Sequence, residues 1–112
     1  MSVEQPDKID GAGVDKVTGA VVLTISDHLP WDDRHLDILE AKLASYVRYI
    51  ESGQCAEQFP STPGQRIDLF LLHRPTDPGH RFLNQAVLAL KGRGISFMFG
   101  PLPTEGYVDE VP

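Results

Sequence analysis

The chain has 112 residues, 41% of them hydrophobic, and a formal net charge of -6. This length and composition are typical of one globular domain. The acidic balance excludes general binding to nucleic acid or to anionic membranes, which requires a basic surface. The single cysteine, Cys55, cannot form a disulfide within the chain, and a reducing compartment is the simplest interpretation. The N-terminus has no signal-peptide pattern and no apolar run could span a membrane, so we expect a cytoplasmic protein.

Two strands are expected at the start of the domain, after a flexible arm over residues 1–7. The first strand is expected over 8–14. The second, over 21–26, alternates apolar with smaller or polar residues at a period of two, which is typical of a strand with one buried face. The domain itself is expected to extend over 8–100.

The turn between these strands determines which residues share a face. A type I turn closed by Gly19 would pair Lys16 with Ala20. Counting back from that pair places Gly11 and Gly13 on the buried face of the sheet. Because glycine has no side chain, these two positions predict that a helix packs directly over the first strand.

The longest helix is predicted over 33–52. Asp32 fits the N-cap position, and Trp31 precedes it as a candidate hydrophobic staple. Gly53 fits a left-handed stop. The apolar side chains that define the buried face recur at spacings of three and four; they are Leu36, Leu39, Leu43, Val47 and Ile50.

The second half of the chain continues as loop, strand, helix and strand. Two prolines and a glycine mark a loop over 54–65, and an apolar run over 66–73 indicates a central strand. Asp77 is expected to cap a second helix, which ends before the last strand at 95–99. Residues 101–112 are expected to form an acidic tail rich in proline and glycine.

The predicted order is β-β-α-β-α-β, which indicates an α+β two-layer sandwich. A four-stranded mixed sheet would carry both helices on one face. Each β-α-β step is expected to be a right-handed crossover, so the second, third and fourth strands would be parallel.

Polar side chains follow the parallel strands where the strands end. Open sheets bind ligands beyond the carboxyl ends of parallel strands, and two helix N-termini also point there. The candidate ligand-binding residues are Asp27, His28, Trp31, His35, His73, Arg74, His80 and Arg81.

Several interpretations of this edge remain open. The histidines with Asp27 could bind a metal such as zinc, although their spacing matches no known signature. A histidine beside Asp27 could act as a general acid or base. Arg74 or Arg81 could hold a small anion. The fourth interpretation is that these are ordinary polar residues near helix starts. No catalytic residue, metal or cofactor is assigned.

The chain also resembles a known family of small bacterial proteins, described only as a domain of unknown function. The resemblance implies a stand-alone bacterial domain and carries no activity or site residue. It rests on Asp7–Asp10, Gly13–Lys16, Thr18-Gly19, Val22–Leu29 and Tyr49–Gly53.

Taken together, the sequence favours binding over catalysis. We expect a protein-interaction module, for instance an immunity-type protein, whose acidic surface covers a basic protein partner. The feature that would indicate this function is an acidic surface patch built from Asp33, Asp37, Glu40 and Glu51, or from the tail. The alternative is an anion or metal site at the histidine-bearing edge, with or without enzymatic activity.

Overall fold

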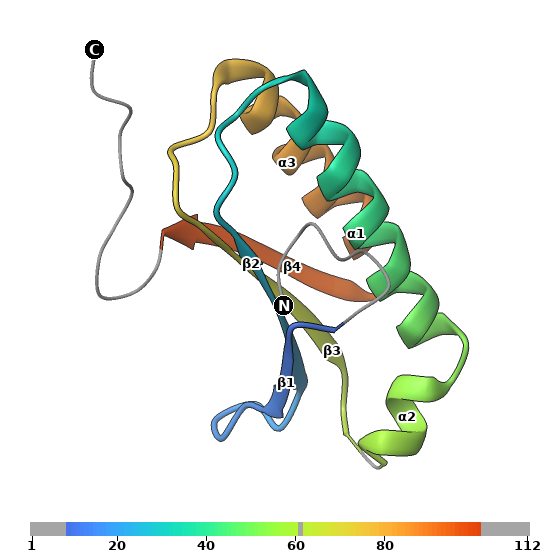
Figure 1. The fold of residues 1–112 in the computed structure, drawn as a ribbon. Helices are drawn as coiled ribbons and strands as arrows, with labels where there is room; N and C mark the ends of the chain where they lie inside the picture. Colours follow the sequence, from blue (N-terminus) through green and yellow to red (C-terminus); the bar gives the residue numbers. More distant parts are fainter. Residues whose placement is uncertain (1–8, 61, 102–112) are drawn as a thin grey trace.

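The computed structural model describes residues 9–60 and 62–101 and contains four strands and three helices (Figure 1). Their bounds are β1 Gly11–Val14, β2 Val21–Asp27, α1 Asp33–Glu51, α2 Gln54–Gln58, β3 Gln65–Leu71, α3 Asp77–Lys91 and β4 Ile95–Pro101. The arm predicted over 1–7 and the tail, apart from Pro101, lie outside the described residues.

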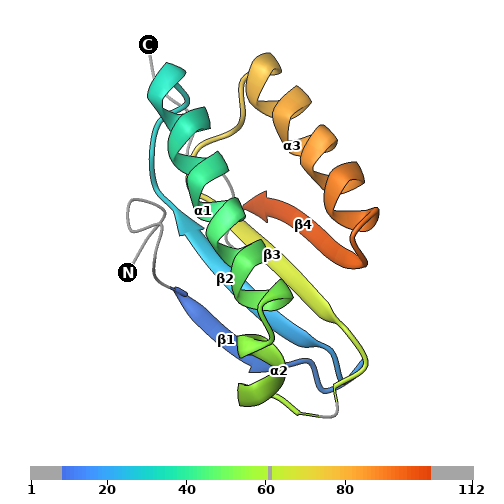
Figure 2. The same ribbon diagram turned by 90° about the vertical axis from the view of Figure 1, so that its right-hand side faces the viewer.

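The four strands form one mixed sheet in the order β1-β2-β3-β4. β1 is antiparallel to β2, whereas β2, β3 and β4 are parallel. Both long helices cover the same face of this sheet (Figures 1 and 2). The predicted α+β sandwich is therefore confirmed. The other face carries no helix among the described residues.

The core lies between the sheet and the two long helices, where the predicted apolar stripes meet. In β2 every second residue is buried, and α1 and α3 contribute leucines from their inner faces. The fully or almost fully buried apolar residues are Val21, Leu23, Ile25, Leu39, Leu43, Tyr46, Cys55, Ile67, Leu69, Leu71, Leu83, Leu90, Ile95 and Phe97.

The predicted start of α1 is confirmed in atomic detail. The Asp32 carboxylate accepts a hydrogen bond from the amide of His35 at 3.0 Å. At the other end Gly53 has a φ of 91°, the left-handed conformation that glycine adopts without strain. The prediction of a continuous loop over 54–65 is wrong, because Gly53 redirects the chain into the short helix α2. The buried thiol of Cys55 anchors this helix to the core.

The hairpin register differs by one residue from the predicted one. The turn closes at Asp15, whose amide donates to the carbonyl of Ala20 at 2.9 Å. Gly11 consequently lies opposite Thr24, and both Gly11 and Gly13 belong to the open face of the sheet. The prediction that a helix packs over these glycines is wrong. A Cβ atom at Gly11 would lie 2.5 Å from the Thr24 hydroxyl oxygen, so glycine makes room for that side chain.

The side chain of Asp15 holds this turn and makes it sensitive to acid. Its Oδ1 accepts from the amides of Val17 at 2.7 Å and Thr18 at 3.3 Å, and its Oδ2 accepts from Arg66 at 3.0 Å. These bonds, the backbone ones first, lower the pKa of Asp15 below its usual value of 3.8. Stability from a lowered pKa is complete above the unfolded value and is lost as pH falls through the folded one.

We therefore expect the amides of Val17 and Thr18 to shift together below pH 3.8, tracking protonation of Asp15 in two-dimensional NMR. Asp15→Asn is the matched control, because it keeps an accepting oxygen but cannot titrate. The same acid transition in that variant would contradict the assignment to Asp15.

The second long helix begins one residue earlier than predicted. Thr76, not Asp77, is the N-cap, and its hydroxyl accepts from the amide of Gly79 at 3.3 Å. Asp77 and Pro78 then occupy the first turn, where a carboxylate and a missing amide donor are both favourable. None of the helices in the described part of the chain has the length and apolarity needed to cross a membrane.

Candidate functional site

Two of the predicted site residues, Asp27 and His35, form a buried pair. Asp27 ends β2, and His35 lies in the first turn of α1. His35 Nε2 is hydrogen-bonded to Asp27 Oδ2, while Asp27 Oδ1 accepts from the amide of Leu29 at 3.1 Å. The two residues are only 3% and 1% exposed. The pair therefore links the end of a central strand to the start of the longest helix.

Both ring nitrogens of His35 are engaged. Nδ1 lies 3.0 Å from the carbonyl oxygen of Pro30, which can only accept, so Nδ1 carries a proton. Nε2 is hydrogen-bonded to the Asp27 carboxylate. No ring nitrogen is left to bind a metal or to take a proton from a substrate. In this geometry His35 connects the Asp27 side chain to the backbone carbonyl of Pro30.

Trp31 packs against the buried pair of Asp27 and His35. Its ring stacks on His35 with the centroids 4.0 Å apart, and its indole nitrogen donates to the backbone carbonyl of His73 at 3.0 Å. A Cβ atom at Gly79 would lie 2.7 Å from a ring carbon of Trp31, so the first turn of α3 approaches the indole closely. Trp31 thus joins both crossover connections.

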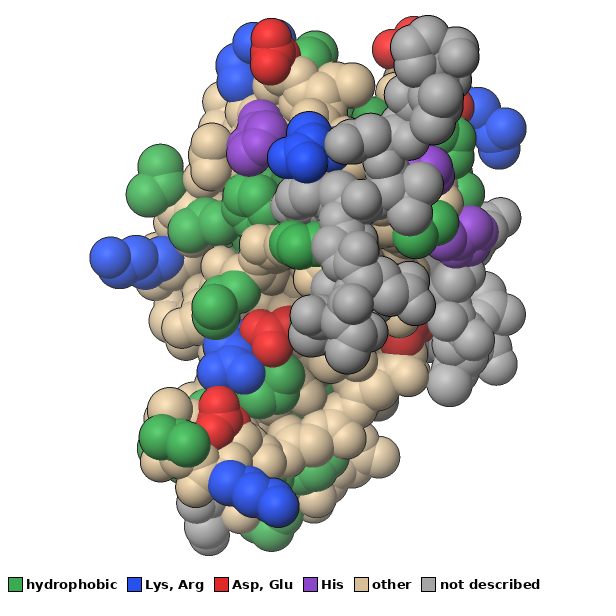
Figure 3. All heavy atoms as spheres, turned by 90° about the vertical axis from the view of Figure 1, so that its left-hand side faces the viewer, with side chains coloured by type: hydrophobic (Ala, Val, Ile, Leu, Met, Phe, Trp, Pro, Cys, Tyr) green, Lys and Arg blue, Asp and Glu red, His purple; other side chains and the backbone are tan. Residues whose placement is uncertain are grey.

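Of the remaining predicted site residues, His73 contacts the cluster through its backbone carbonyl, which accepts from Trp31. His28, Arg74, His80 and Arg81 are exposed, and His73 is partly buried. The His80 ring meets Phe99 edge-on at 5.9 Å between centroids. In the open-face view of Figure 3 the visible histidine side chains do not form one group. Across residues 9–60 and 62–101, no three side chains of His, Cys, Asp or Glu are placed to hold a metal ion.

A second buried polar cluster was not predicted. Lys42 is fully buried, and its Nζ donates to Asp10 Oδ1 at 2.8 Å. The other Asp10 oxygen accepts from the amide of Ser26 at 3.0 Å. The Tyr46 hydroxyl accepts from the Asp10 amide at 2.8 Å and donates to the Thr24 carbonyl at 2.6 Å. Burial raises the pKa of Tyr46, which keeps this hydroxyl a donor.

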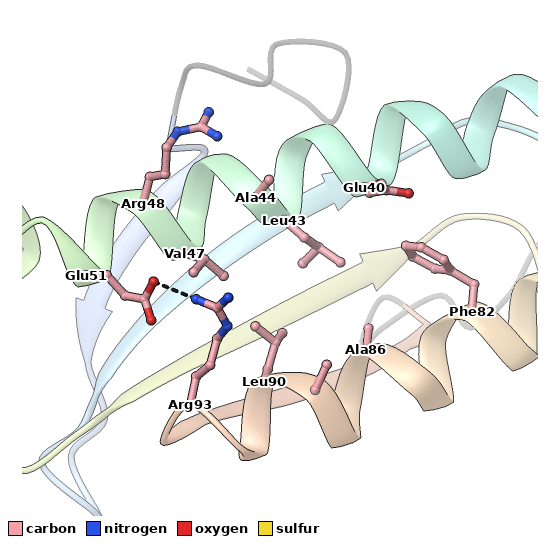
Figure 4. A pocket seen from close by; sticks show the side chains of 11 residues that line it. Glu40, Leu43, Ala44, Val47, Arg48, Glu51, Phe82, Ala86, Leu90 and Arg93 are labelled. Carbon is pink, nitrogen blue, oxygen red and sulfur yellow. Dashed lines mark hydrogen bonds and ion pairs between the residues drawn. The ribbon is translucent and has the colours of Figure 1, made fainter.

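An open groove, also absent from the sequence prediction, lies between α1 and α3 on their outer side (Figure 4). Its volume is about 550 Å³, within the range of ligand-binding pockets. Apolar side chains line its middle, and small residues on the facing sides of the helices leave the space open. The uncharged lining residues are Leu43, Ala44, Val47, Phe82, Ala86, Ala89 and Leu90.

The two ends of the groove carry different charges. Glu40 lies at the end near Phe82, whereas Arg48 lies toward the other end (Figure 4). That other end is bridged by an ion pair in which Arg93 donates to Glu51 at 2.7 Å. Both partners are about half exposed, so the pair contributes about 0–1 kcal/mol and can open.

An acidic stripe extends the groove along α1. We define it as Asp33, Asp37 and Glu40, all of which are exposed. Their spacings of four and three residues put them on one side of the helix, in line with Ala44 of the groove. Three of the four residues of the predicted acidic patch are thus contiguous, while Glu51 lies at the far end and is ion-paired.

Comparisons with known proteins give the family of this chain. No curated protein and no solved structure matches it. The model of a family of unknown function, DUF6572, matches residues 1–102, in agreement with the resemblance inferred from the sequence. Because this match covers far more than half of the chain, the protein belongs to the DUF6572 family.

Proposed function

We propose that this protein is a cytoplasmic protein-binding module that takes a basic, amphipathic helix of a partner protein into the groove between α1 and α3. The observation that carries the proposal is the continuity of an apolar groove with an exposed acidic stripe. The net charge of -6 supports a basic partner, and the free buried thiol of Cys55 supports a reducing compartment. An immunity-type role is one form of this function.

A helix is the occupant that fits the shape of the groove. A helix laid in a groove buries its apolar stripe and keeps its polar side in water. Here the stripe would cover Leu43, Val47 and Phe82. Lysine or arginine residues of the partner would meet the acidic stripe at the Glu40 end. The opposite end carries Arg48 and the ion pair between Glu51 and Arg93, and its net positive charge disfavours such residues, which gives the partner a preferred direction.

The alternative site at the histidine-bearing edge has less support. Both nitrogens of His35 already have hydrogen-bond partners, and His80 packs on Phe99. An apolar surface beside acidic side chains recognises a protein segment better than it recognises a small anion.

Two designed peptides test the proposal. One is an 18-residue amphipathic helix of leucine and lysine, and the other carries glutamate in place of lysine. In two-dimensional NMR we expect the lysine peptide to give saturable shifts at groove residues such as Ala44, Val47 and Ala86. Binding should be at least about tenfold weaker for the glutamate peptide, a difference of about 1.4 kcal/mol.

A matched pair of variants locates the binding. Ala44→Arg fills the groove and should weaken lysine-peptide binding at least about tenfold. Ala41→Arg adds the same side chain to an exposed position of α1 that does not line the groove, and should leave binding unchanged. Equal effects of the two variants, equal binding of the two peptides, or no groove shifts at roughly millimolar peptide would refute the proposal.

A further inference from the structure

The outer edge of β4 is long, regular and uncharged. Among the described residues β4 pairs on one side only, with β3, over all seven of its residues. Its sequence, Ile-Ser-Phe-Met-Phe-Gly-Pro, contains no charged side chain. Soluble proteins usually protect such an edge with charges, bulges or short strands, because its free amides and carbonyls are a template for another strand. β1, at the opposite edge, has only four residues.

Apolar and acid-free surface surrounds this edge. Met98 on β4 is 57% exposed, and Leu88 on α3 is 71% exposed. The 3.6-residue helical repeat places Leu88 on the side of α3 away from the groove. In Figure 2 this is the side of α3 away from α1, at the edge of the molecule where β4 also lies. The chain holds 16 acidic residues, yet none of them lies within 78–101. The charged residues of this stretch are Arg81, Lys91 and Arg93, so it adds no repulsion between carboxylates of two copies.

We propose that β4 is a dimerisation edge: two copies of this chain pair their β4 strands antiparallel, around a two-fold axis at Met98. The axis is perpendicular to the sheet, so both copies keep their helices on the same side. Residues opposite each other must then share a face. The register centred on Met98 satisfies this condition and is the one that pairs every residue of the strand. It sets Phe97 opposite Phe99 of the second copy.

The same two-fold axis brings complementary charges of α3 together. α3 packs against β4, and the two elements have similar lengths of about 22 Å and about 23 Å, so the middle of α3 lies near the middle of β4. Two copies of α3 would run antiparallel across the axis. Lys91 at the end of one helix would face Asp77 at the start of the other, with the helix dipoles also opposed favourably.

The strands alone cannot supply the whole interface. A strand about 23 Å long, spaced about 4.8 Å from its neighbour, covers little of the roughly 800 Å² per partner typical of stable interfaces. The flank of α3 must therefore take part, which gives the exposed side chain of Leu88 a place in the contact.

Sedimentation equilibrium of the full chain at roughly 100 µM tests the proposal. We expect a mass of twice 12.4 kDa. Met98→Lys places two like charges on the axis and should raise the dissociation constant at least tenfold. Val14→Lys puts the same charge at a similarly exposed position, 51% exposed, on the other edge strand, and should leave the dimer intact. Circular dichroism verifies that both variants fold.

Cysteine substitution tests the register. Opposite residues of antiparallel strands have Cα atoms about 4.5–5.5 Å apart, close enough for a disulfide. Met98→Cys should therefore give a covalent dimer on mild oxidation. Ser96→Cys, whose copies would lie about 13 Å apart, should not. A mass of 12.4 kDa at the tested concentration, as when residues 102–112 cover the edge, would overturn the proposal. Equal cross-linking of the two variants would overturn the two-fold axis at Met98.

Discussion

Asp10→Ala is expected to lower the free energy of unfolding by about 3–5 kcal/mol, the usual effect of removing one partner of a buried ion pair. The fully buried ammonium of Lys42 would lose its carboxylate, and the amide of Ser26 would lose its acceptor. Water cannot easily replace either lost hydrogen-bond partner, because the site has no exposed surface. Urea denaturation followed by circular dichroism measures the loss. Asp37→Ala, which removes an exposed carboxylate, should change stability by less than about 0.5 kcal/mol.

A double-mutant cycle then separates the ion pair from general disruption. Lys42→Met keeps the length and apolar stem of the side chain but leaves Asp10 without its cation. Asp10→Ala and Lys42→Met each break the ion pair between these side chains, whereas the second substitution in the double variant has no ion pair left to break. The double variant should therefore lose less stability than the sum of the two, with a coupling of about 1–3 kcal/mol. Strict additivity would mean that the two side chains do not stabilise each other.

The elements of the fold could be predicted because their patterns are local. In β2 the alternation of Val21, Leu23 and Ile25 marks the buried face, and α1 has both a capping carboxylate and a stop glycine in sequence. These signals need no knowledge of the rest of the chain. They explain why the element order, the parallel strands and the single helical face were correctly predicted.

The hairpin register and α2 depend on finer interactions. A single side chain, Asp15, closes the turn one residue earlier than the glycine pattern indicates, and that one step moves Gly11 and Gly13 to the other face. The polar segment of α2 has five residues, too few for a periodic signal. The segment is helical because the side chain of Cys55 packs in the hydrophobic core.

The site residues were harder to predict because their environment is built from distant segments. Asp27 and His35 were both expected at this edge, but the carbonyl that engages the second nitrogen depends on the exact path of the crossing. Lys42 shares the helix face of Leu39 and Tyr46, which was a usable signal for burial; its partner lies 32 residues earlier. The groove depends on the spacing between two helices, which neither helix specifies alone.

Asp27→Ala is expected to lower the free energy of unfolding by about 3 kcal/mol or more, for a reason different from loss of packing alone. Removing the carboxylate leaves His35 Nε2 and the Leu29 amide without their hydrogen-bond partner in a site that is almost inaccessible to water. Asp27→Asn should recover part of this loss, since its amide oxygen can still accept from the Leu29 amide and its amide nitrogen can donate to Nε2. Ser26→Ala, at the exposed neighbouring position, should change stability by less than about 0.5 kcal/mol.

The histidine ring provides an independent measurement of the same pair. In the native protein, nitrogen NMR of His35 should show a proton on Nδ1, held by the Pro30 carbonyl, that exchanges slowly with solvent. In Asp27→Ala this proton should exchange faster, because the ring is no longer fixed from its other side. The first turn of α1 would loosen with it, so the lysine peptide should lose contacts at Asp33 while keeping those at Ala44. A native ring that exchanges as fast as an exposed histidine, or an Asp27→Ala variant as stable as the native chain, would show that His35 is not the anchor of this turn.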